Sequence, residues 1–151
     1  MKKQQFVNCL AVLAAWSMLA GTAYAQVSPV GLWRTIDDNT GKPRGEVRIT
    51  ENSQGLSGRI VRSLAADASK EATVCKACTD DRKDQPMTGL EIVRGGKLAA
   101  DGQWYEGGEI LDPDNGKTYR LKIRLVEGGA KLNLRGYIGP FFRTQTWERA
   151  E

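Results

Sequence analysis

Apolar and cationic side chains alternate at every position in the stretch Tyr119-Arg120-Leu121-Lys122-Ile123-Arg124-Leu125. This is the strictest alternation of side-chain polarity in the sequence. Side chains of a β-strand point alternately to opposite faces of the sheet, so the apolar members share one face and the cationic members share the other. A helix, with about 3.6 residues per turn, would mix these two classes. The stretch therefore predicts an antiparallel strand that is buried on one face and solvated on the other.

The same two-residue period recurs along most of the chain. It is regular at residues 46–50 and 131–135 and weaker at 56–64. Further strands are expected at residues 32–38, 89–94, 103–111 and 143–149, which brings the total to about eight. The one candidate for a helix is the alanine-rich segment 63–72.

Short turns separate these segments. Asn, Asp, Gly and Pro residues supply the positive or fixed φ angles of tight reversals, and they cluster at 38–41, 52–55, 101–102, 112–116 and 127–129. Strands joined by short turns form a meander, and a meander of about eight strands in a small domain closes into a barrel or folds into a sandwich. Because closure removes the exposed strand edges, we predict an all-β antiparallel barrel.

The first 25 residues have the order of a cleavable signal peptide. Lys2 and Lys3 precede an apolar run at residues 6–20, which is followed by the small-residue cleavage site Ala23-Tyr24-Ala25. The run is short for a transmembrane helix, and a retained N-terminal anchor is the alternative. Cleavage after Ala25 leaves a single domain, residues 26–151, of 126 residues (151 minus 25). We therefore expect a periplasmic or secreted protein with no membrane segment after cleavage.

Charge and composition exclude several classes of function. The predicted mature chain carries 20 basic and 18 acidic residues, because Lys2 and Lys3 account for two of the 22 basic residues. A net charge of +2 (20 minus 18), with acids and bases interspersed, does not favour nucleic-acid binding. The absence of histidine excludes a Ser-His-Asp triad, a Cys-His pair and a histidine-bound metal. We expect neither a metal nor a cofactor.

A long polar connection, residues 65–86, interrupts the strand pattern and contains Cys75 and Cys78 in a C-x-x-C motif. In an oxidising compartment these cysteines are expected to form a disulfide that stiffens the loop. A catalytic dithiol is the alternative, but the neighbouring Asp80 and Asp81 would raise a thiol pKa and disfavour the reactive thiolate. A zinc site is also disfavoured, because there is no second cysteine pair.

The two ends of the predicted domain contain complementary residues. Gly31 and Trp33 open the first strand, and Arg143 and Arg149 belong to the last. These strands are neighbours in a closed meander, so an arginine of the last strand is expected to lie over the indole of the first and to plug one end of the barrel. The Gly-x-Trp motif with a basic residue on the last strand resembles the lipocalin and calycin barrels.

A resemblance to a bacterial family covers nearly the whole domain. The matching segments are GLWRTIDD (31–38), TGKPRG (40–45), LSGRI (56–60), KDQP (83–86), GGEILDP (107–113), GKTY (116–119) and RTQTW (143–147). Together with the C-x-x-C motif they resemble the bacterial domain-of-unknown-function family 2147 (DUF2147). The resemblance implies a signal peptide and a lipocalin-like (calycin-like) barrel, but it implies no particular activity.

An eight-stranded barrel is either filled by side chains or holds one small ligand. Aromatic and cationic residues on the strands supply the candidate ligand-binding residues, which are Trp33, Trp104, Tyr119, Arg135, Tyr137 and Trp147. Alternation places Arg135 on the outer face, but a bulge at Gly136 or Gly139 would redirect Arg135 and Tyr137 into the cavity mouth as a carboxylate clamp.

The leading hypothesis is a non-enzymatic binding module that carries a small apolar or amphipathic ligand in its barrel. The first alternative is a structural or interaction protein of the cell envelope that contacts a protein partner through the 65–86 loop. The second alternative is a thiol-disulfide enzyme that uses Cys75 and Cys78. Barrels of this kind support unrelated functions, so the fold alone does not choose among these hypotheses.

Overall fold

The computed structural model describes residues 27–67 and 71–151 of the chain, so the predicted signal peptide lies outside the described residues. Within them, nine strands form one antiparallel sheet. The strands are β1 (Gly31–Ile36), β2 (Pro43–Asn52), β3 (Gly55–Ser63), β4 (Glu91–Arg94), β5 (Lys97–Leu98), β6 (Tyr105–Asp112), β7 (Lys117–Val126), β8 (Lys131–Ile138) and β9 (Phe141–Arg149), with the short 3-10 turn η2 (Glu127–Gly129) before β8.

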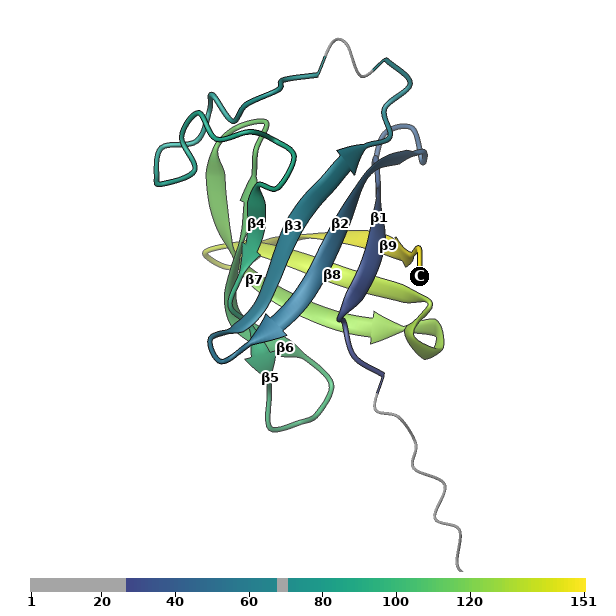
Figure 1. Cartoon of the computed structure of the whole chain (residues 1–151). Helices are drawn as coiled ribbons and strands as arrows, with labels where there is room; N and C mark the ends of the chain where they lie inside the picture. Colours follow the sequence, from purple (N-terminus) through teal and green to yellow (C-terminus); the bar gives the residue numbers. More distant parts are fainter. Residues whose placement is uncertain (1–26, 68–70) are drawn as a thin grey trace, which may run out of the picture.

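Eight of these strands pair in a closed ring. Figure 1 shows the barrel that they form. Its order is β4-β3-β2-β1-β9-β8-β7-β6, and β4 pairs with β6 where Val93 lies opposite Ile110. The two-residue β5 pairs only with the start of β6. The first and last strands are neighbours, with Trp33 opposite Arg149. This arrangement confirms the predicted all-β closed barrel.

The alternation that predicted β7 also orders the core. Leu121 and Ile123 are buried, whereas Lys122 on the opposite face forms an ion pair with Glu106 of β6. Residues that repeat every second position along the other strands form the rest of the core. Its most deeply buried members are Trp33, Val47, Ile49, Leu56, Val93, Leu111, Leu132 and Trp147.

Three segments differ from the predicted boundaries. β2 begins at Pro43 and runs for 10 residues, so it is longer than the predicted strand at 46–50. β5 follows directly after β4 and was not predicted. The described part of the candidate helix at 63–72 contains the end of β3 and loop but no helix. In the described part of the chain, no helix has the length and hydropathy needed to span a membrane.

One end of the barrel is closed by the residues before β1. The Trp33 indole donates a hydrogen bond to the carbonyl of Pro29 (2.7 Å), and Arg149 lies over its ring. Gly31 has a φ of +143°, and a Cβ there would lie 2.6 Å from Nη1 of Arg149, so this close approach requires glycine. Because the strands alternate in direction, the turns at 37–42, 113–116 and 139–140 and the described residues of the connection 64–90 lie at the opposite end.

Candidate ligand-binding site

A cavity of about 980 Å³ occupies that opposite, open end of the barrel. Its volume lies near the top of the range of about 300–1,000 Å³ that is usual for small-molecule sites. Apolar side chains from seven parts of the chain line its apolar side, namely Val47, Ile60, Met87, Ile92, Ile110, Leu111, Leu134 and Trp147. Charged and polar side chains surround its mouth, so the cavity is amphipathic along its depth.

Arg44 enters the cavity because the backbone is irregular beside it. Thr35 of β1 pairs with Gly45, and the next residue, Ile36, pairs with Pro43, so Arg44 has no partner across this ladder. A β-bulge of this kind changes the direction of the side chain that it carries. Pro43 fits the same irregularity, because it has no N–H to donate to a regular ladder.

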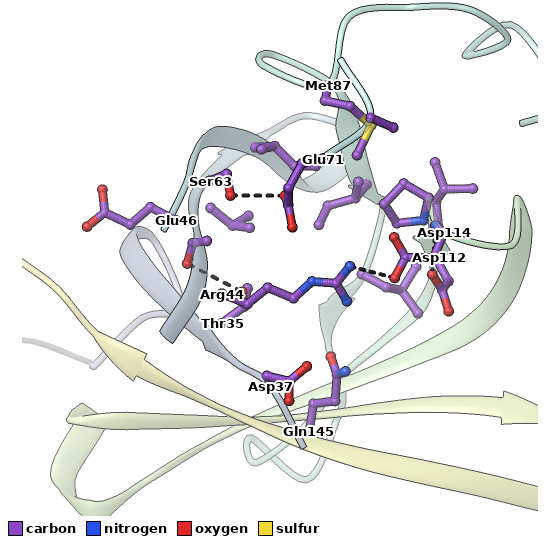
Figure 2. Close-up of a pocket in the computed structure, with 18 of the residues that line it drawn as sticks. Thr35, Asp37, Arg44, Glu46, Ser63, Glu71, Met87, Asp112, Asp114 and Gln145 are labelled. Atoms are coloured by element: carbon purple, nitrogen blue, oxygen red, sulfur yellow. Dashed lines mark hydrogen bonds and ion pairs between the residues drawn. The ribbon is translucent and has the colours of Figure 1, made fainter. Parts of the chain in front are cut away.

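The side chain of Arg44 extends across the cavity toward the β6–β7 turn, as Figure 2 shows. Its Nη2 donates a 2.6 Å hydrogen bond to Oδ2 of Asp114. This bond raises the pKa of the Arg44 guanidinium above its ordinary value. The turn itself is held by Asp112, whose carboxylate accepts hydrogen bonds from the backbone of Asp114 and the side-chain amide of Asn115. This half-exposed ion pair, with 48% and 54% of the two side chains accessible, therefore links Arg44 to the turn at the cavity mouth.

Other charges at the mouth are also engaged. Arg143 of β9 forms an ion pair with Asp38 in the β1–β2 turn. The Asp37 carboxylate accepts hydrogen bonds from the backbone N–H and the hydroxyl of Thr40, and these bonds lower its pKa. Glu71 accepts a hydrogen bond from the Ser63 hydroxyl (3.0 Å), which is drawn in Figure 2. The mouth therefore presents organised charges of both signs.

The connection between β3 and β4 forms one wall of the cavity. Thr73, Val74, Ala77 and Met87 line the cavity. The predicted disulfide is present in this segment, and Cys75 and Cys78 are each only 1% exposed. The turn of the motif packs on the β6–β7 turn so tightly that a Cβ at Gly116 would lie 1.9 Å from the carbonyl oxygen of Ala77.

Arg82 fixes the second half of this connection. Its side chain is 3% exposed and donates hydrogen bonds to the carboxylates of Asp80 and Glu109 and to the carbonyl of Glu91. The hydrogen bonds from Arg82 lower the pKa of Asp80 to about 2. A buried guanidinium with several acceptors holds this long connection against the barrel.

The structure separates the residues that the sequence suggested for the ligand site. Tyr119 and Trp147 line the cavity, whereas Trp33 lies in the core at the closed end. Trp104 lies against the outer face, where Arg124 and Arg135 stack on its ring at 5.2 and 4.8 Å. Of the two arginines predicted to close the barrel, Arg149 stacks on Trp33, whereas Arg143 lies at the cavity mouth.

The alternative in which a bulge redirects Arg135 and Tyr137 into the cavity mouth is not found, because the structure places both on the outer face. The β7–β8 ladder has an uninterrupted register from Arg120 opposite Tyr137 to Val126 opposite Lys131, so no bulge redirects them. Gly136 instead takes the inward position between them and lines the cavity. Arg135 is held between the rings of Trp104 and Phe142, each 4.8 Å from its central carbon.

Arg44 is the main site residue that the sequence analysis did not identify. Its position became visible only with the pairing of β1 and β2, because a bulge cannot be recognised from one strand alone. Gln145, which lies opposite Leu134 and lines the cavity, was also missed. No cluster of three or more His, Cys, Asp or Glu side chains with the arrangement of a metal site is found among residues 27–67 and 71–151.

Comparisons with known proteins agree on the fold. A family model described as "Uncharacterized protein conserved in bacteria (DUF2147)" matches residues 31–149. No curated protein matches the sequence. The solved structure of HP1028 from the human pathogen Helicobacter pylori, which is described as belonging to the lipocalin family, is similar with a TM-score of 0.68 and 18% sequence identity. The similarity covers 83% of this chain and 84% of that chain, and it identifies the fold as lipocalin-like.

Proposed function

The chain belongs to the bacterial family DUF2147, and from its cavity we propose that it is an exported, non-enzymatic protein that binds a small amphipathic molecule. The cavity of about 980 Å³ carries the proposal, because it is apolar in its depth and charged at its mouth. A ligand with an apolar tail and a polar head group matches this distribution.

The apolar part of the ligand is placed among the inward side chains of several strands. Ile60, Ile110 and Leu134 contribute aliphatic surface, and Trp147 closes the deep side of the cavity. Transfer of apolar surface from water to this wall supplies about 25 cal/mol per Å² buried. The ligand would therefore gain most of its affinity from its tail.

The head group is placed at Arg44, and we assign it the chemistry of a carboxylate or another oxyanion. A guanidinium has five N–H donors, and within the described residues the Arg44 guanidinium makes one hydrogen bond, to Asp114. Planar donors that remain available suit a bidentate contact with an oxyanion. Asp114 occupies one of these donors, so its carboxylate competes with the head group of the ligand for Arg44.

Two features support export and a structural role for the cysteines. Residues 1–25 have the pattern of a signal peptide, and a disulfide is stable in an oxidising compartment. Thiol-disulfide exchange requires access of an attacking thiolate to a sulfur atom, whereas both sulfur-bearing residues are 1% exposed. The same connection walls the cavity, which favours a role in ligand binding over the alternative of an envelope contact surface.

The test is native mass spectrometry of the exported protein purified gently from its own host, compared with an Ile60→Trp variant. Ile60 lines the cavity, so an indole there fills space that the ligand would occupy. The expected result is a discrete adduct on the wild-type protein that is lost on denaturation and is absent from the variant. An adduct-free wild-type protein that also fails to bind added long-chain carboxylates would contradict the proposal.

A further inference from the structure

The β8–β9 hairpin exposes apolar side chains at its tip. Phe141 is 78% exposed, Phe142 is 54% exposed and Ile138 is 58% exposed. They flank the two-residue turn Gly139-Pro140, with Ile138 paired opposite Phe141, and with Phe142 on the other face of the hairpin. We call these three residues the hairpin tip. Large apolar side chains that are clustered and exposed typically mark an interaction surface.

The hairpin tip lies at the open end of the barrel, on the same side as the cavity mouth. Two residues after Phe141, Arg143 lines the cavity and forms an ion pair with Asp38 of the β1–β2 turn. A surface that takes up the hairpin tip would therefore meet the mouth of the cavity as well.

Arginines accompany the hairpin tip on the outer face of β7 and β8. Arg120 donates a hydrogen bond to the carbonyl of Gly139 (3.2 Å) in the turn itself. Arg135 and Arg124 follow along the same face, stacked on Phe142 and Trp104. Among the described residues, none of these three arginines forms an ion pair with a carboxylate, in contrast to the neighbouring Lys122.

Arg135 is the clearest example of a positive charge on this face that no carboxylate among the described residues neutralises. Its guanidinium lies between two aromatic rings, and its Nε is buried without a hydrogen-bond partner in the described part of the chain. Uncompensated positive charge beside an apolar projection is the combination that binds an anionic lipid surface, where apolar side chains enter the acyl boundary and cations contact head groups.

From this combination we propose that the hairpin tip docks the barrel on an anionic lipid bilayer. Phe141 and Ile138 enter the interfacial region, and Arg120 contacts the phosphates or carboxylates of the head groups. The open end of the barrel then faces the membrane, which is a source of amphipathic molecules. The proposed function supplies the reason for docking, which is access to amphipathic ligands in the membrane. The contact between the hairpin tip and the bilayer does not require a bound ligand.

A lipid surface fits better than an apolar protein groove. An apolar groove would leave the arginines beside the hairpin tip without counter-charges, whereas an anionic bilayer offers both a nonpolar region and negative charge within one surface. Aromatic side chains are also well suited to the interface between water and acyl chains.

The experiment is co-sedimentation with vesicles of phosphatidylcholine that contain or lack phosphatidylglycerol. The exported wild-type protein is compared with Phe141→Ser and Arg120→Gln. Leu98→Ser and Lys97→Gln are the matched controls, because both residues are exposed and belong to β5 at the closed end of the barrel. All variants share one N-terminus, so any contribution of that segment cancels in the comparison.

We expect binding to the phosphatidylglycerol vesicles that is weakened about tenfold or more by Phe141→Ser and about fivefold by Arg120→Gln at low salt. The control variants should bind as the wild type does. Equal binding of wild type and Phe141→Ser, or equal binding to vesicles that lack phosphatidylglycerol, would overturn the proposal. A dimer that is lost in Phe141→Ser, without vesicle binding, would instead assign the hairpin tip to a second copy of the chain.

The Ile60→Trp variant separates the two proposals. If both are correct, it loses the ligand and retains wild-type binding to the vesicles. Vesicle binding by a protein that never takes up a ligand would overturn the proposed function alone. Ligand uptake in solution by a protein that does not bind vesicles would overturn the docking alone.

Discussion

The guanidinium of Arg149 lies over the indole of Trp33, with its central carbon 4.2 Å from the ring centroid. The same guanidinium donates hydrogen bonds to the carbonyls of Ser28 (2.8 Å), Val30 (3.0 Å) and Gly129 (2.7 Å). One side chain of the last strand thereby joins the first strand, the segment before it and the β7–β8 turn. This contact is a structural closure of the barrel and lies away from the cavity.

Replacing Arg149 with methionine should lower the free energy of unfolding by about 2–4 kcal/mol, because the change removes three hydrogen bonds from a charged donor and the stacking on Trp33. Urea denaturation followed by tryptophan fluorescence measures the effect. The matched control is Arg48→Met, since Arg48 forms an exposed ion pair with Glu151, and a loss below about 1 kcal/mol is expected there. Equal losses in the two variants would remove the special role of Arg149.

The Asp80–Arg82 pair should make stability depend on acid pH. The hydrogen bonds from Arg82 lower the pKa of Asp80 to about 2 in the folded protein, against 3.8 for an unperturbed aspartate. A carboxyl whose pKa is depressed on folding stabilises the fold above the unfolded pKa, and this contribution disappears as the pH falls through the folded pKa. The difference in stability between wild type and Asp80→Asn should therefore be constant near neutral pH and narrow from about pH 4 to about pH 2. Denaturant titrations across this range test it; a difference that stays constant to pH 2 would contradict it.

Arg82 itself should be more costly to remove than Asp80, because its side chain is 3% exposed and serves acceptors from several segments. Arg82→Gln is expected to destabilise the protein by about 3–5 kcal/mol at neutral pH, since the carboxylates around it lose their counter-charge. Arg59→Gln is the control, because the exposed Arg59 pairs with Glu91 at 3.5 Å near the same connection. Thermal and urea unfolding of the two variants provide the measurement, and a smaller loss in Arg82→Gln than in Arg59→Gln would refute the anchoring role.

Loss of the disulfide should loosen the cavity wall more than the barrel. The double variant Cys75→Ala/Cys78→Ala removes a very short covalent loop, so the free energy of unfolding should fall by about 2 kcal/mol or less. Val74 and Ala77 line the cavity, so dissociation of a bound ligand should become faster in the variant. Stopped-flow ligand release and urea denaturation measure the two effects. If ligand release is unchanged and the free energy of unfolding falls strongly, the disulfide stabilises the barrel and does not hold the cavity wall.

Most of the fold was predictable because its main signal is local. The period of two in residues 119–125 follows from strand geometry alone, and it correctly predicted the burial of Leu121 and Ile123. Closure of the meander into a barrel predicted that the first and last strands are neighbours, and Trp33 does lie opposite Arg149. Strand β5 was not predicted because its two residues are too few to show an alternating pattern.

The site was less predictable because it depends on pairing between strands. The direction of Arg44 is set by a bulge against β1, which requires the register of two strands to be known. At Gly136 the sequence left both a bulge and a regular strand open, and the structure shows the regular register. The missing side chain of Gly136 leaves room beside Tyr119, whose Cβ would lie 3.2 Å from a Cβ at position 136. A glycine in a strand thus permits either a bulge or a close approach, and only the neighbouring strand decides.

Arg44 provides the sharpest test of the ligand's head group. Arg44→Gln should weaken the binding of a long-chain carboxylate about tenfold or more, because the oxyanion loses a charged bidentate donor. The same variant should bind the corresponding alcohol as tightly as the wild type does. Arg48→Gln is the control, since this exposed arginine of the same strand pairs with Glu151 and does not line the cavity. Asp114→Asn gives a further contrast: it keeps the shape of the mouth but removes the carboxylate that competes for Arg44, so the carboxylate ligand should bind as tightly as to the wild type or more tightly. Displacement of a fluorescent fatty acid measures the affinities of the wild type and the three variants for the carboxylate and the alcohol. If Arg44→Gln weakens the alcohol as much as the carboxylate, Arg44 shapes the cavity and does not bind the head group; if Asp114→Asn abolishes binding of both, the Arg44–Asp114 pair holds the mouth open.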